Sequence, residues 1–234
     1  SERDVLRELL ERIKKLLETL IRIVEELVRR SEETIKRLAE LNRRLIEEIR
    51  RIVEEVKKDV EEEILRDVER LLKELADETE KILREVKKRL DDNLKRLEEI
   101  VRDVERLLKE LKEEVDRGDK SKEELVREIL KVAEEILRKI EELVKHHLDL
   151  NRDILRLFTE SAEKLEEILR EVLRKLRLDE EVKKRVEELR REYRETLKRL
   201  RDESEKIAEE LKRLLDELRR RLEELARELR ERTK

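Results

Sequence analysis

The chain has 234 residues, of which 56% are charged and 36% hydrophobic, and 64 basic against 68 acidic residues give a net charge of −4. The two signs are interleaved, so no basic surface is expected that would bind the phosphates of a nucleic acid. Cysteine is absent, which excludes disulfides and thiol chemistry and leaves the redox compartment open. Proline is also absent, and one glycine and two aromatic residues are too few for the turns and strands of a β-sheet.

Hydrophobic residues recur at helical spacing along the whole chain, which indicates a folded all-α protein rather than a disordered one. No apolar run approaches the roughly 20 residues that a membrane-spanning helix needs. The sequence also lacks the pattern of a signal or transit peptide. We therefore expect a soluble protein with no membrane partner, and the sequence assigns it to no compartment.

The first predicted helix spans residues 2–57 and ends in a short polar break. Asp59 is a suitable N-cap for the next helix, and Glu62 follows three residues later, as in a capping box. These signals predict a second helix over residues 60–115.

The second break contains Gly118, the only glycine, which suits the left-handed position just after a helix. Ser121 and Glu124 then form another capping-box pattern, which predicts a third helix over residues 122–177. At the third break Asp179 is the expected N-cap of a fourth helix over residues 180–232.

Each predicted helix has about 55 residues, and connections this short force consecutive helices to lie antiparallel. The sequence thus predicts an all-α fold, a single-chain up-down-up-down antiparallel four-helix bundle forming one domain over residues 1–234. It consists of a hairpin over 1–115 and a hairpin over 122–234, joined by the loop 116–121. The apolar stripe drifts by about 20° per heptad, as on a straight helix, so we expect nearly straight helices and a rod on the order of 80–85 Å long.

Uncharged polar residues are scarce, and most of them fall on the inward stripe. A buried polar group without a partner costs roughly 1–3 kcal/mol, so these residues are expected to bond to one another. Folding the chain at its three breaks places them in two layers. One layer contains Ser31, Asn93, His147, Asn151 and Ser204. The other contains Asn42, Thr79, Ser161, Tyr193 and Thr196, with Thr34 between the two layers.

The chain combines capped loops (GDKS and LDEE), helices of nearly equal length, and Asn, Ser, Thr and His residues on the inward stripe. It resembles computationally designed helical bundles with buried hydrogen-bond networks. That resemblance implies a structural role, in which polar layers fix helix register and pairing as a buried Asn does in coiled coils. The resemblance is not a family motif, so it transfers no active site.

The residues themselves offer little chemistry. His146 and His147 point about 100° apart on a helix, so they cannot readily chelate one metal, and we expect His147 to be a core residue. Ser161 has no strained turn and no glycine-rich loop to build an oxyanion hole, so we expect no nucleophilic catalysis. Tyr193 and Phe158 are expected to fill the core. We predict neither an enzyme, nor a metal site, nor a bound cofactor.

Two classes of function remain open. The first is a structural or interaction scaffold that needs no partner, either as a self-contained bundle or as two hairpins that open and exchange between chains. The second is a lipid-surface-binding amphipathic protein of the exchangeable apolipoprotein kind. Against the second class, interfacial helices usually carry Trp or Phe on the apolar face, and inward Asn or His would be costly against acyl chains.

Overall fold

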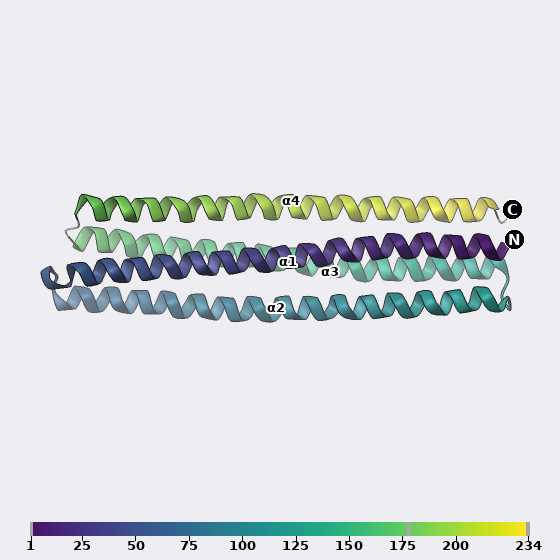
Figure 1. Cartoon of the computed structure of the whole chain (residues 1–234), viewed down its shortest axis with the longest axis horizontal. Helices are drawn as coiled ribbons and strands as arrows, with labels where there is room; N and C mark the ends of the chain where they lie inside the picture. Colours follow the sequence, from purple (N-terminus) through teal and green to yellow (C-terminus); the bar gives the residue numbers. More distant parts are fainter. Residues whose placement is uncertain (1, 177–178, 233–234) are drawn as a thin grey trace. The chain divides into compact units, whose positions relative to one another are not determined.

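The computed structural model describes residues 2–176 and 179–232, and within these ranges the chain is an all-α four-helix bundle (Figure 1). The fold class predicted from the sequence is confirmed. A short 3₁₀ helix, η1, follows the first long helix. The bounds are α1 Glu2–Val56, η1 Lys57–Asp59, α2 Glu62–Arg117, α3 Lys122–Lys175 and α4 Glu180–Arg232. None of the described helices is long and apolar enough to cross a membrane.

The first break differs from its prediction. The chain does not end α1 at 57 and start α2 at 60; instead residues 57–59 tighten into η1 and α2 begins at Glu62. Asp59 belongs to η1, and the extended backbone of Val60 (φ −120°, ψ 142°) redirects the chain after it. The Leu65 amide donates to the Glu61 carbonyl at 3.2 Å, so Asp59 is not the N-cap of α2. A 3₁₀ turn commonly provides hydrogen bonds for the last carbonyls of a helix. Here it includes Asp59, the residue that was expected to cap the next helix.

The second break confirms the local signals and shifts one boundary. Gly118 has φ +70°, the left-handed conformation expected after a helix. Because α2 runs directly up to it, the helix ends at Arg117 rather than at 115. The Glu124 amide donates to Ser121 Oγ at 3.3 Å, which is the predicted N-cap bond of α3.

At the third break α4 begins at Glu180, as predicted, and the Lys183 amide donates to the Asp179 carbonyl at 3.1 Å. The predicted end of the third helix, residue 177, lies outside the described residues. Within them α3 ends at Lys175.

The chain forms two compact units, and each contains one segment of every long helix. Unit 1 comprises Ser1–Arg29, Asp91–Asp149 and Lys206–Lys234; unit 2 comprises Arg30–Leu90 and Leu150–Glu205. Each unit has its own four-helix core. The single domain expected over residues 1–234 stays a prediction.

In unit 1, ion pairs join α1 to α2, α2 to α3, α3 to α4 and α4 to α1. The pairs are Arg7–Asp116 (2.8 Å), Lys139–Asp103 (2.9 Å), Arg219–Glu141 and Arg12–Glu228 (3.8 Å). The four segments therefore form a closed ring in chain order. Most of these side chains are about half exposed, and exposed pairs contribute roughly 0–1 kcal/mol each, so the unit is held mainly by its aliphatic core.

Unit 2 has the same ring order. Lys164–Glu78 (2.7 Å) joins α2 to α3, Arg194–Glu166 (2.6 Å) joins α3 to α4, and Arg185–Glu48 (3.6 Å) joins α4 to α1. Its core draws on all four helices and includes Ile49, Leu72, Leu165, Val186 and Tyr193. In such a ring α1 and α3 lie diagonally opposite each other.

Candidate functional site

The most buried polar side chain of unit 2 is Asn42 of α1, which is 0% exposed. Its position follows from helical periodicity, because residues three or four positions apart lie on one face. Leu38, Leu45 and Ile46, four before, three after and four after it, are all buried. The apolar stripe of α1 therefore carries an amide into the middle of the core.

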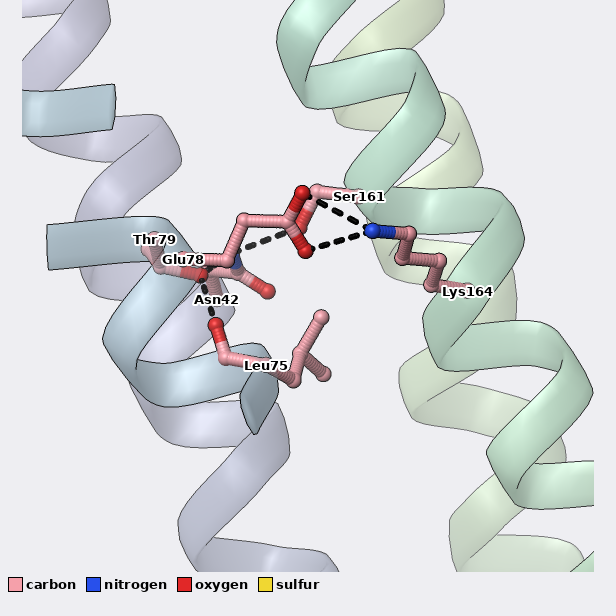
Figure 2. A network of polar contacts seen from close by, with 6 residues as sticks. All are labelled: Asn42, Leu75, Glu78, Thr79, Ser161 and Lys164. Carbon is pink, nitrogen blue, oxygen red and sulfur yellow. Dashed lines mark hydrogen bonds and ion pairs between the residues drawn. The ribbon is translucent and has the colours of Figure 1, made fainter. Parts of the chain in front are cut away.

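Asn42 bonds to two other helices (Figure 2). Its Nδ2 donates to Thr79 Oγ1 of α2 at 2.9 Å and to Ser161 Oγ of α3 at 3.2 Å. Thr79 and Ser161 are each 3% exposed. We refer to Asn42, Thr79 and Ser161 as the Asn42 cluster.

Hydrogen-bond chemistry fixes the direction of these bonds. The Thr79 hydroxyl has one proton and donates it to the Leu75 carbonyl of its own helix at 2.7 Å. Its oxygen must then accept from Asn42, which requires the NH₂ side of the amide to face Thr79. The second N–H of the same group reaches Ser161. One amide group thus serves two acceptors on two helices.

The bond to Ser161 crosses the core diagonally. The ion pairs of unit 2 join neighbouring helices of the ring, whereas Asn42 of α1 reaches α3 on the opposite side. A bond inside the core is also shielded from the solvent that weakens the surface pairs. The Asn42 cluster is therefore sensitive to the position of three helices at once.

Tyr193 is buried, but it makes no hydrogen bond to the cluster, contrary to the bonding predicted within its layer. It is 3% exposed, and within the described part of the chain neither its Oη nor Asn42 Oδ1 has a hydrogen-bond partner. Helical side chains lean toward the N-terminus of their own helix, and α1 and α4 run antiparallel. Counted from the turns, Asn42 and Tyr193 start at similar heights, and the rule predicts that they lean in opposite directions. Burial also raises the pKa of the Tyr193 phenol, which keeps it neutral.

Thr196 is likewise outside the cluster. Its hydroxyl donates to the Glu192 carbonyl of its own helix at 2.8 Å, and the side chain is partly exposed. A threonine hydroxyl often donates to the carbonyl four residues earlier in its helix. Here this local bond occupies the hydroxyl proton, so Thr196 cannot donate it to another residue of the predicted layer. Thr34, predicted between the layers, is half-buried in unit 2.

The residues of the other predicted layer fall in different units. Ser31 and Asn151 are buried and Ser204 is half-buried in unit 2, whereas Asn93 and His147 are buried in unit 1. Their association in one layer stays a prediction.

His147 is 1% exposed, whereas His146 is exposed. Burial lowers the pKa of His147 to about 4, so its imidazole is neutral at physiological pH.

An ion pair beside the Asn42 cluster was not predicted from the sequence. Glu78 of α2 accepts two hydrogen bonds from Lys164 Nζ of α3, at 2.8 and 2.7 Å, close to the cluster in Figure 2. This bond raises the pKa of Lys164. Charged residues make up 56% of this chain, so no composition signal could single out this pair.

The arrangement offers little for catalysis. Ser161 accepts a bond from an amide, and an amide is not a general base that could activate its hydroxyl. Among the described residues, no group of three or more His, Cys, Asp and Glu side chains could hold a metal ion. The geometry instead joins helices.

Comparison with protein-family models, with curated proteins and with solved structures finds no match to this chain.

Proposed function

We propose that this chain is a structural scaffold without catalytic activity, of the designed helical-bundle kind that its sequence resembles. In this proposal the Asn42 cluster specifies the register of α1 against α2 and α3. The observation that supports it most is the single amide group of Asn42, which donates to hydroxyls on two other helices from a fully buried position.

An aliphatic core alone specifies register weakly. Leucine, isoleucine and valine recur along every helix, so a slip of one turn, about 5.4 Å, brings one aliphatic residue to the place of another. The same slip moves Asn42 away from Thr79 and Ser161. Buried polar groups that lose their partners cost roughly 1–3 kcal/mol each, so the slipped arrangement is disfavoured by at least tenfold.

The proposal predicts an asymmetry between single and combined substitutions. Asn42→Leu alone leaves Ser161 buried without its donor and should destabilise the bundle by roughly 1–3 kcal/mol. Replacing the whole cluster (Asn42→Leu, Thr79→Val, Ser161→Ala) removes the buried polar groups together. That variant should be about as stable as the parent chain, or more stable, but less specific in register.

Distances between spin labels on α1 and α3 test this directly. The chain has no cysteine, so labels can be attached at Arg43→Cys and Glu163→Cys, two exposed positions of unit 2. The parent chain should give one narrow distance distribution. The whole-cluster variant should give a broader one, with added distances from slipped arrangements. A triple swap of core aliphatics in the same unit (Ile49→Leu, Leu72→Ile, Ile168→Leu) should stay narrow.

An equally narrow distribution in the whole-cluster variant would show that the aliphatic core and the turns set the register without the cluster. The lipid-surface alternative has its own assay, co-flotation of the full chain with anionic liposomes. Opening the bundle onto acyl chains would expose Asn42 to them without Thr79 or Ser161, which is costly, so the scaffold proposal expects no binding. Binding would contradict it.

A further inference from the structure

The helices of unit 1 are unequally buried. Among the described side chains, ten hydrophobic residues of α1 are buried there, nine of α3 and six of α2, but only four of α4: Leu211, Leu218, Leu222 and Leu225. Ile207 and Ala208, which precede them on the same face, are only half-buried. The α4 segment therefore has the smallest apolar contact with the rest of its unit.

Grooves flank this segment on both sides. One, of about 510 Å³, lies between α3 and α4 and is lined by Leu130, Leu137, Leu222 and Ala226. The other, of about 210 Å³, lies between α1 and α4 and is lined by Leu16, Leu20, Leu214 and Leu218. These open edges explain why leucines such as Leu214 stay half-buried.

The α2 segment of unit 1 also has an open edge. It has a groove of about 550 Å³ on its α1 side, with Val101 and Leu108 in the lining. On its α3 side the Lys139–Asp103 ion pair bridges the two helices at 2.9 Å. Thus α2 resembles α4 in having an open edge, but it buries more hydrophobic residues.

We infer that the α4 segment from Lys206 to Arg232 is the exchangeable element of unit 1, and that the face of α1 and α3 beneath it binds the same segment of a second copy. Two of the contacts that join this segment to its neighbours are the ion pairs Arg219–Glu141 and Arg12–Glu228. Their side chains are 31% to 57% exposed, so each pair holds the segment weakly.

The stripe and the charges of this face argue for a second copy as its partner. The face takes leucines at the spacing of Leu211, Leu218, Leu222 and Leu225. Along its α3 edge the groove presents Glu134, Arg138 and Glu141, which are acidic on balance. Along its α4 edge it presents Arg219, Glu223, Arg227 and Arg230, which are basic on balance. A helix that occupies this place needs both the leucine stripe and arginines beside the α3 glutamates. The α4 of another copy carries both, whereas the other helices of the chain place their charges differently.

The test uses the full chain and a fluorescent peptide with the sequence of residues 206–232, followed by anisotropy. The chain's own α4 competes with the peptide, so weakening the intramolecular contact should raise the apparent affinity. Leu218→Ala with Leu222→Ala in the chain should raise it at least tenfold. The matched control, Leu108→Ala with Leu111→Ala, removes two buried leucines from α2 of the same unit and should change it by less than about twofold. Circular dichroism checks that both variants remain helical, and Leu218→Ala alone replaces the double variant if that one unfolds.

Hydrogen exchange of the unaltered chain gives a second, independent result. Backbone amides of α4 from 206 to 232 should exchange at least tenfold faster than those of α1 within residues 2–29. Equal exchange rates, equal peptide capture by the α2 and α4 variants, or equally tight binding of a control peptide with the sequence of residues 91–117 would each overturn the inference.

Discussion

His147 should make the stability of this protein depend on pH between about 6.5 and 4. Its side chain is 1% exposed, and burial lowers its pKa from 6.5 to about 4. In the unfolded chain the imidazole takes up a proton as the pH falls below about 6.5, but in the fold it stays neutral until about pH 4. The stabilisation is therefore complete above pH 6.5 and is lost progressively between pH 6.5 and 4.

The magnitude follows from the shift. One unit of pKa corresponds to about 1.4 kcal/mol, so a shift from 6.5 to about 4 gives a total loss of about 3 kcal/mol, of which about 2 kcal/mol is already lost at pH 5. The chain has two histidines, and the other one, His146, is exposed.

Guanidinium unfolding at about pH 7.5 and about pH 5, followed by circular dichroism, measures this loss. The free energy of unfolding of the parent chain should fall by about 2 kcal/mol more over this interval than that of His147→Leu. His146→Gln is the matched control and should behave like the parent chain. Carboxylates that begin to titrate near pH 5 contribute equally to all three proteins and cancel in the comparison. An identical pH dependence for the parent chain and His147→Leu would refute the reasoning, because it would mean that the buried imidazole is protonated as easily in the fold as in the unfolded chain.

Three further predictions concern the turns and the whole bundle. Gly118→Ala should cost roughly 1–2 kcal/mol in chemical denaturation because its φ of +70° is left-handed, and Gly118→Asn should cost less because asparagine tolerates that region; equal costs would contradict this. Ser121→Ala removes the N-cap bond to the Glu124 amide and should lower stability by about 1 kcal/mol, with Ser121→Asp largely restoring it. The parent chain should keep most of its helical circular dichroism at about 90 °C, since long capped helices bury aliphatic side chains along their whole length, and a midpoint below about 60 °C would show that this burial has been overestimated.

The all-α class and most helix boundaries could be predicted because they depend on local chemistry. Helical periodicity identifies the inward face, and Gly118, Ser121 and Asp179 end or start helices through bonds within a few residues. The burial of Asn42, Thr79 and Ser161 could be read in the same way, since each lies on an apolar stripe. The helix boundaries at the first break, and Asp59 as N-cap, were predicted wrongly because a capping box and a 3₁₀ turn compete for the same residues. The sequence does not show which of the two forms.

Which polar residues bond to one another was decided by the tertiary structure. Counting residues from the turns gives the height of a side chain along a helix, and it places Asn42, Thr79, Ser161, Tyr193 and Thr196 close together. It does not give the direction in which each side chain leans, or the competing bond that its own helix offers. Because their helices are antiparallel, the side chains of Tyr193 and Asn42 are expected to lean in opposite directions, and Tyr193 Oη has no partner among the described residues. Thr196 bonds its own backbone. Only three of the five residues therefore meet, because a hydrogen bond depends on distances and angles within a fraction of an ångström, whereas helical periodicity specifies a face of the helix.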